Sequence, residues 1–207
     1  MHLPDGLVPV GMAMAGYAGS GALLALSLNR IARLPDPGAA MPRAAMLTAV
    51  LFAVGSIAIP VPPTTVHPML AGLMGVLLGW FAVPAILVAL FLQAVLFGHG
   101  GLTTLGLNGL ILAPTALIAW ATWRALAPRA PVLAAVIAGS GGVLLSLAVF
   151  VGLVLLGLPA DVDRGAEWAA LVVFVTAHLP LVVAEGMLVV VVLRTLTRIE
   201  PGLLPGR

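Results

Sequence analysis

The chain has 207 residues, of which 62% are hydrophobic and 8% are charged, and it contains nine basic residues, seven acidic residues and no cysteine. With a mean hydropathy of +1.21, it carries more apolar surface than a soluble domain of this size can bury. Disulfides and thiolate metal sites are excluded. The basic residues are all arginines in short clusters between apolar blocks, so no nucleic-acid partner is expected. We predict one all-α, polytopic membrane domain over residues 1–207, with the lipid bilayer as its surroundings.

The chain begins with Met1-His2-Leu3-Pro4-Asp5-Gly6, directly before the first apolar block. This start lacks the basic stretch of a signal peptide. Methionine aminopeptidase removes Met1 only before small residues, so we expect Met1 to be retained before His2. The Met1 amine, the His2 amide nitrogen and His2 Nδ1 can then close adjacent chelate rings on one cation. Residues 1–9 are therefore a candidate metal-chelating segment, and an ordinary disordered N-terminus is the alternative.

Six apolar blocks follow, each near or above the roughly 20 residues that a helix needs to cross the hydrocarbon. They run from Val10 to Leu28, Ala44 to Pro60, Met69 to Phe97, Leu102 to Trp123, Val132 to Leu158 and Trp168 to Leu193. Cytoplasmic loops collect arginine, so the three arginine clusters are placed inside. These clusters are Arg30, Arg33 and Arg43; Arg124 and Arg129; and Arg194, Arg198 and Arg207. The acidic loop with Asp161, Asp163 and Glu167 is placed outside.

The number of crossings follows from the arginine clusters. Between Arg43 and Arg124 the chain must cross an even number of times, yet three apolar blocks lie there. The middle block, Met69 to Phe97, is long for one span and carries Gly79-Trp80-Phe81 near its centre, where an interfacial turn fits. Splitting this block predicts seven transmembrane helices, with the N-terminus outside and the C-terminus cytoplasmic. A re-entrant block would give five crossings and the same orientation.

This topology places three of the four histidines, His2, His67 and His99, on the outer side. Three nitrogens from Met1-His2 and one from His67 would complete a four-nitrogen set. An ionised amide is a strong-field ligand, and such a set favours square-planar Ni²⁺ or Cu²⁺ over the tetrahedral preference of Zn²⁺. A capping or interfacial role for His67 is the alternative. His99 stands between glycines, which indicates either a further ligand or a mobile loop residue.

Four more polar side chains fall within predicted spans. His178 and Glu185 share one face of the last helix, about 10 Å apart along its axis. An ionised carboxylate in the membrane costs at least about 3 kcal/mol unless it is paired, so Glu185 must face the bundle interior. There it could relay protons, accept from a metal-site histidine, or bond helix-end backbone of a neighbour. Gln93 and Asn108 are expected to bond between helices, with pathway lining as the alternative.

Taken together, these residues resemble the CbiM/NikM family over almost the whole chain and in family order. The matching residues are Met1-His2, Pro4-Asp5-Gly6, Val66-His67, Gln93 to Gly98, Gly100-Gly101-Leu102-Thr103, Gly106, Asn108, His178-Leu179-Pro180-Leu181 and Glu185-Gly186. The family comprises substrate-specific S components of energy-coupling-factor (ECF) transporters for cobalt or nickel. The resemblance implies a seven-helix subunit of the prokaryotic inner membrane that captures Ni²⁺ or Co²⁺ outside the cell.

The resemblance also implies which residues bind the metal and which proteins assist. Family members hold it with the N-terminal amine, the amide and ring nitrogens of the second residue, and a histidine after the second helix, here Met1, His2 and His67. Asn108, Gln93, His99, His178 and Glu185 become supporting or pathway residues. The implied partners are a transmembrane coupling (T) subunit, ATPase (A) subunits and often a small accessory membrane protein. No phosphate-binding loop is present, so ATP hydrolysis belongs to the partners and no catalytic residue is expected.

The identity of the metal is left open by two departures from the family pattern, one of which is that His99 stands at a position where the family has no fixed ligand. Cobalt-type members often carry His-Pro-Thr-Gly-Thr-Gly, whereas this chain has His67-Pro68-Met69-Leu70-Ala71-Gly72. The nitrogen set leans towards Ni²⁺, and Co²⁺ accepts the same donors. The imported metal would serve either cobalamin biosynthesis or a nickel enzyme.

Two other functions fit parts of the sequence. A metal-dependent intramembrane hydrolase would use His178, Glu185 and His67, but no HExxH or serine-elbow motif is present. A proton-coupled permease would be centred on Glu185 with His178, and Glu185→Gln would then abolish transport while leaving metal binding intact. The S-component hypothesis predicts instead that even one residue added before Met1 destroys metal binding.

Overall fold

The computed structural model describes residues 2–62, 64–157 and 163–204. Its elements, in chain order, are α1 Val10–Ala32, η1 Gly38–Ala40, α2 Met41–Gly55, β1 Ile59–Val61, β2 Thr64–Val66, α3 Ala71–Leu78, η2 Gly79–Phe81, α4 Ala82–Phe97, α5 Leu105–Leu126, α6 Pro131–Val136, η3 Ile137–Gly141 (a π-helical turn), α7 Gly142–Gly157, α8 Arg164–Ile199 and η4 Pro201–Leu203. The described chain is therefore a helical bundle, as predicted. The antiparallel hairpin of β1 and β2, with Ile59 opposite Val66, was not predicted from the sequence.

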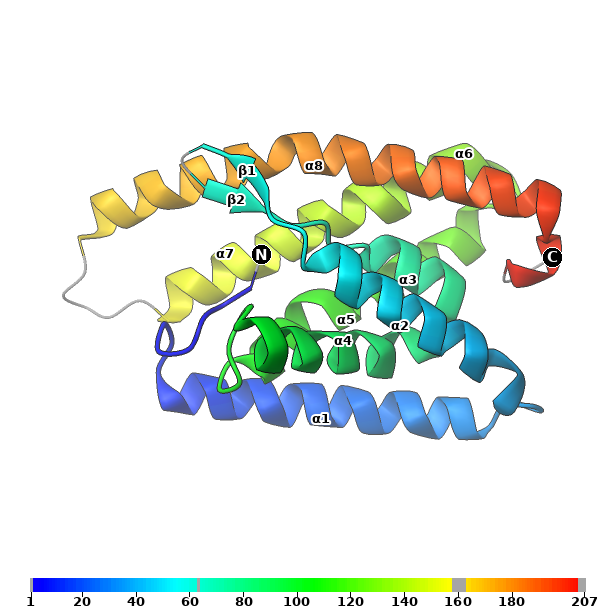
Figure 1. Ribbon diagram of the computed structural model, residues 1–207, viewed down its shortest axis with the longest axis horizontal. Coiled ribbons are helices and arrows are strands. Elements are labelled where there is room, and N and C mark those ends of the chain that lie inside the picture. Colours follow the sequence, from blue (N-terminus) through cyan, green and yellow to red (C-terminus); the bar gives the residue numbers. More distant parts are fainter. Residues whose placement is uncertain (1, 63, 158–162, 205–207) are drawn as a thin grey trace.

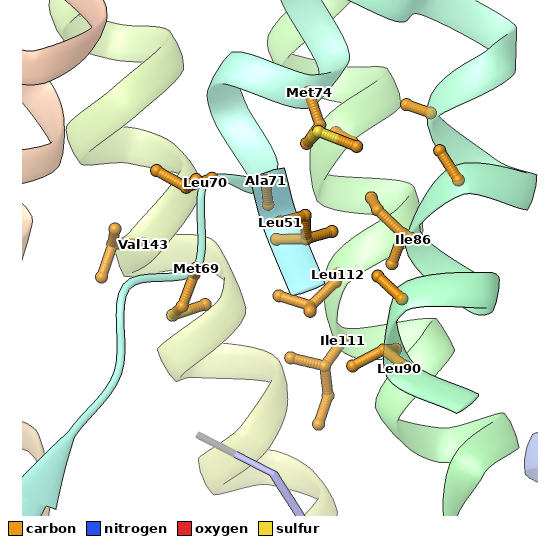
Figure 2. Packing of buried hydrophobic residues seen from close by; sticks show 14 of the residues in the cluster. Leu51, Met69, Leu70, Ala71, Met74, Ile86, Leu90, Ile111, Leu112 and Val143 are labelled. Atoms are coloured by element: carbon orange, nitrogen blue, oxygen red, sulfur yellow. The ribbon is translucent and has the colours of Figure 1, made fainter. Parts of the chain in front are cut away.

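The bundle is organised around α5, which contacts α1, α3, α4 and α7. Helices α1 and α8 run lengthwise along opposite sides of the bundle (Figure 1). The main core lies between α4 and α5, where Ile86, Ile111 and Leu112 are almost inaccessible to solvent. Figure 2 shows these side chains against Leu51 of α2 and Ala71 at the start of α3. Leu3 of the N-terminal segment belongs to the same buried cluster.

The described helices form a surface suited to a bilayer. Six stretches are long and apolar enough to cross a membrane, namely Val10–Ala32, Gly38–Gly55, Ala71–Phe97, Leu105–Leu126, Pro131–Gly157 and Arg164–Ile199. Large apolar side chains face outward, among them Leu156, which is 80% exposed, and Val191, which is 60% exposed. Apolar side chains on the outside of a helical bundle are stable in contact with lipid tails, whereas in water their exposure would be unfavourable. The chain is an integral membrane protein, as predicted.

The long block from Met69 to Phe97 is broken at the predicted place. Helix α3 ends at Gly79, whose φ of 54° lies in the left-handed region that glycine adopts without strain. On α3, Gly75 lies against Ala116 of α5, and Trp80 in η2 lies edge to face with Trp120, further along α5. On α4, Leu87 lies against Gly109, nearer the start of α5. The chain therefore runs along α5 in one direction through α3 and returns through α4.

Two of the differences between predicted and observed helix boundaries have a clear local cause. Helix α2 ends at Gly55 and not at Pro60, because Ile59–Val61 pairs as β1 with β2. Helix α8 is longer than the predicted block because Asp163 caps its first turn, accepting from the Gly165 N–H at 2.8 Å. Leu158 and Asp161 lie outside the described residues.

Candidate metal-binding site

The N-terminal segment is anchored inside the bundle by α5. Leu3 is completely buried, at 0% exposure. Its main-chain N–H donates to Asn108 Oδ1 at 2.8 Å, and its carbonyl accepts from Asn108 Nδ2 at 3.1 Å. The Thr104 hydroxyl donates to the same carbonyl at 2.6 Å. Buried main-chain groups need such partners, so Asn108 and Thr104 fix the residue next to His2.

Asp5 forms a second anchor, which sequence reasoning did not assign. Its carboxylate accepts from the main-chain N–H groups of Leu102 at 3.2 Å and Thr103 at 2.9 Å, and from Thr103 Oγ1 at 2.6 Å. A Cβ at Gly101 would collide with this carboxylate. The Thr103 hydroxyl is the main cause that lowers the pKa of Asp5 from its ordinary value, and the two main-chain donors add to it.

The hydrogen bonds to Asp5 predict that the attachment of the N-terminal segment to Leu102 and Thr103 depends on pH. Because the pKa of Asp5 is lowered in the folded chain, its stabilising effect is present above the unfolded pKa and is lost as the pH falls through the folded pKa. Asp5→Asn should therefore lower the protection factors of the Leu102 and Thr103 N–H groups at neutral pH, and acidification should lower the protection factors of the same groups in the native chain, each measured against the intrinsic exchange rate at that pH. Asp36→Asn is the matched control, because Asp36 also accepts a main-chain N–H, from Ala39 at 3.1 Å. Equal exchange in the native chain and Asp5→Asn would contradict the anchoring role.

Three histidines converge at the anchored segment. The rings of His67 and His99 have centroids 4.6 Å apart, with an interplanar angle of 74°. A Cβ on Gly100 would lie 3.2 Å from His2 Cβ, so the loop that carries His99 packs on His2. The His99 ring lies edge to face with His67, in a loop that packs on the N-terminal segment.

A small cavity adjoins two of these histidines. Its volume is about 10 Å³, room for about one water or ion. Gln93 forms part of the wall, and its Nε2 donates to the carbonyls of Leu51 at 3.4 Å and Phe52 at 3.3 Å, which is the predicted bonding between helices. The cavity is lined by His2, Leu51, Gly55, His67, Pro68, Met69, Leu90, Gln93 and Leu112.

The imidazoles beside the cavity are electrically neutral at pH 7. Burial lowers the pKa of His67 to about 4, and the neighbouring His99 adds to the effect. Burial is also the main cause that lowers the pKa of His2 well below its ordinary value. Among the described residues, neither His67 Nδ1 nor His99 Nδ1 has a hydrogen-bond partner, although both atoms are buried. Neutral imidazoles with unpaired nitrogens are suitable ligands for divalent transition metals.

Side chains of the described residues do not complete a metal site by themselves. Within residues 2–62, 64–157 and 163–204, no group of three or more His, Cys, Asp or Glu is placed to hold a metal ion. Additional donors must therefore come from other groups, such as main-chain nitrogen. Met1, whose amine the sequence predicts as a ligand, lies outside the described residues.

Glu185 lies next to the cavity but supports the backbone. It is 3% exposed, and its carboxyl accepts from the main-chain N–H of Met69 and from that of Leu70, the latter at 3.1 Å. Leu70 precedes α3 and has a positive φ of 49°. Of the roles left open for Glu185, the structure therefore shows hydrogen bonding to main-chain groups just before α3, and the first of these groups lies two residues after His67.

His178 is completely buried and lies on the same face of α8 as Glu185, two helical turns before it. Its Nδ1 donates to the Phe174 carbonyl at 2.8 Å, and in the described part of the chain its Nε2 has no partner. The ring also lies against that of Phe174, with centroids 4.2 Å apart. His178 does not line the cavity between His2 and His67.

The fold and the site define a class of protein, a polytopic helical membrane protein with histidines gathered at an anchored N-terminal segment. Residues 2–203 match the family model described as the cobalt uptake substrate-specific transmembrane region, CbiM. The chain therefore belongs to the CbiM family. Membership confirms the predicted resemblance and the prediction of a transport subunit and not an enzyme.

Individual relatives agree with this family. The chain is 34% identical to the cobalt transport protein CbiM 2 of Pelobacter propionicus, over 96% of this chain and 91% of that protein. It is 32% identical to the cobalt transport protein CbiM of Geobacter sulfurreducens, over 99% of this chain and 61% of that protein. It is 36% identical to the fused nickel transport protein NikMN of Rhodobacter capsulatus, over 81% of this chain, but it spans only 48% of that protein.

Two solved structures share the fold. A truncated transition metal transporter superimposes with a TM-score of 0.82 and 23% identity, covering 96% of this chain and 99% of that one. A second transition metal transporter superimposes with a TM-score of 0.83 and 22% identity, covering 97% of this chain and 94% of that one.

Proposed function

We propose that this chain is the substrate-binding membrane subunit of an ECF-type importer and that it captures Ni²⁺ or Co²⁺ on the outer side of the prokaryotic inner membrane. The proposed ligands are the Met1 amine, the His2 amide and ring nitrogens, and His67. The single observation that carries the proposal is that His2 and His67 line one ion-sized cavity. The anchoring of Leu3 by Asn108 supports it, because it holds the main chain of the next residue in place.

The proposed donor set leans towards Ni²⁺. Four nitrogens that include an ionised amide impose a strong square-planar field, which Ni²⁺ prefers and Co²⁺ tolerates. The names of the relatives include both metals, nickel for the Rhodobacter capsulatus protein and cobalt for the Pelobacter propionicus protein. Imported cobalt would serve cobalamin biosynthesis.

The proposed topology has seven crossings, with the N-terminus outside and the C-terminus cytoplasmic. The reversal between α3 and α4 supports counting that block as two helices. Arg43 Nη1 donates to the Leu203 carbonyl at 3.0 Å, so the first arginine cluster lies beside the C-terminal segment. Trp123, which precedes Arg124 of the second cluster, lines one cavity together with Arg194 of the third cluster, and this supports the same side for both clusters. Arginines gathered at one end are typical of a cytoplasmic face.

The proposed partners are a transmembrane T subunit, A-type ATPases and a small accessory membrane protein. Support comes from family membership, since a substrate-specific region needs other subunits to supply the energy of transport. No second function is favoured by the site, because Glu185 and His178 bond main-chain groups and do not line the cavity.

The proposal is tested by metal retention. The purified chain with a native, untagged N-terminus is exposed to equal Ni²⁺ and Co²⁺, and the bound metal is measured together with its absorption spectrum. We expect one metal per chain, with the yellow colour of low-spin Ni²⁺. Retention of Co²⁺ alone would reverse the preferred metal, and retention of neither ion would refute the proposed site.

A further inference from the structure

We propose that a phospholipid of the cytoplasmic leaflet binds in a groove between α2 and α4, with one acyl chain in the groove and an anionic headgroup at the arginines near its open end. This inference goes beyond metal capture, and it takes from the proposed topology only the side of the membrane on which the lipid lies. It is carried by the shape of the groove, its apolar lining and the charge at its open end.

The groove lies along the contact of α2 with α4 and is hollow because small side chains line it (Figure 1). Its volume is about 520 Å³, within the range of about 300–1,000 Å³ that is typical of sites for small organic molecules. Phe81 and Ala85 form a buried floor, whereas Val88 at the rim is 50% exposed. The lining residues of α2 recur every three or four positions and include Met41, Ala44, Ala45, Thr48, Ala49 and Phe52.

The groove is closed at one end and open at the other. At the closed end, Gln93 Nε2 of α4 donates to the carbonyls of Leu51 and Phe52 of α2. The rings of Phe52 and Phe97 stack at the same end, with centroids 5.4 Å apart. The open end lies at Met41, the first residue of α2, which is exposed. A long, thin molecule can therefore lie along the groove with one end at Met41.

The lining favours a hydrocarbon chain over a polypeptide. Among the described residues, none that lines the groove is charged, and the Thr48 hydroxyl already donates to the Ala44 carbonyl at 2.7 Å. An extended peptide would leave its main-chain N–H and C=O groups without partners, which the bilayer does not tolerate. A helix with its side chains is about 10–12 Å wide, so it does not fit between two helices whose ends are in contact. An acyl chain needs no hydrogen-bond partner.

The open end of the groove lies where positive charge gathers. Residues 30–43, which connect α1 to the first turn of α2, carry Arg30, Arg33 and Arg43 and one acidic residue, Asp36. The guanidinium of Arg30 lies 5.6 Å from the ring centroid of Trp80, and Trp80 directly precedes Phe81 of the groove floor. Arg33 is exposed at the end of α1. Each arginine near a membrane surface strengthens binding to anionic lipid about fivefold, so an anionic headgroup is favoured here.

The test is native mass spectrometry of the purified chain with phosphatidylglycerol or phosphatidylcholine that carry identical acyl chains. We expect one phosphatidylglycerol per chain, bound at least about fivefold more tightly than phosphatidylcholine. Ala45→Phe fills the groove and should abolish this binding. Met46→Phe is the matched control, because Met46 is the next residue, is 63% exposed and does not line the groove.

Two further measurements keep the inference testable if Ala45→Phe folds poorly. Arg33→Gln should weaken phosphatidylglycerol about fivefold and leave phosphatidylcholine unchanged. A photoreactive amino acid placed at Val88 and activated in intact membranes should yield an adduct with the mass of a phospholipid.

Three results would overturn the inference. They are equal lipid binding by Ala45→Phe and Met46→Phe, equal affinity of the native chain for the two lipids, and crosslinking of position 88 to another polypeptide. Failure of the proposed function is distinguishable, because no metal is added in these experiments and metal retention is measured separately.

Discussion

Adding two residues before Met1 is expected to abolish tight binding of Ni²⁺ and Co²⁺, the largest effect predicted for this chain. The extension moves the amine away from the His2 chelate, and the segment next to it cannot shift to compensate because Leu3 is bonded to Asn108 and Thr104. The sequence-based prediction that a single added residue suffices needs correction, because one added residue would create a new chelate of amine, two amides and the His2 imidazole; two residues are therefore used. The loss should exceed the roughly 10- to 100-fold cost of removing an outer partner of a metal site.

Isothermal titration with each metal checks this prediction. The matched control carries the same two residues at the C-terminus, which leaves the amine unchanged. Undiminished affinity in the N-terminally extended chain would remove the amine from the ligand set. A hydrolase or a permease centred on Glu185 would tolerate the extension, so the result also separates these functions from metal capture.

Glu185→Ala is expected to lower both stability and metal affinity. The substitution leaves the buried N–H groups of Met69 and Leu70 without their acceptor, at a cost of about 1–3 kcal/mol for each group. Because these groups lie directly after His67-Pro68, the loss should also let His67 move relative to the cavity. Glu185→Gln keeps one acceptor oxygen and should lose less of either quantity.

Thermal unfolding in detergent and metal titration measure these effects. Glu200→Gln is the control, since Glu200 is exposed at the end of the same helix. A permease predicts the opposite pattern for Glu185→Gln, with metal binding intact and transport abolished. Unchanged stability in Glu185→Ala would contradict the role assigned to the carboxyl group.

The sequence predicted those features that depend on local chemistry. Apolar blocks gave the membrane helices, and Gly79 gave the break between α3 and α4, because a positive φ favours glycine. His2 and His67 were placed on one side by counting crossings, and the structure places both on one cavity.

Features set by contacts between distant segments could not be predicted. Asp5 is 97 residues from Leu102, and only the folded chain brings the carboxylate to that N–H. Glu185 is 115 residues from Leu70, so the sequence indicated a buried partner without identifying it. The contact of His99 with His67 depends on how the loop after α4 packs on the N-terminal segment, which the sequence around His99 does not indicate.

Nitrogen atoms of the N-terminal segment and His67 are proposed to hold the transported ion. X-ray absorption spectroscopy of the Ni²⁺-loaded chain with its native N-terminus, beside His67→Ala, measures the coordinating atoms themselves. We expect an inner coordination shell of nitrogen with an imidazole contribution that falls in His67→Ala. An oxygen-rich shell that is identical in the two proteins would contradict it.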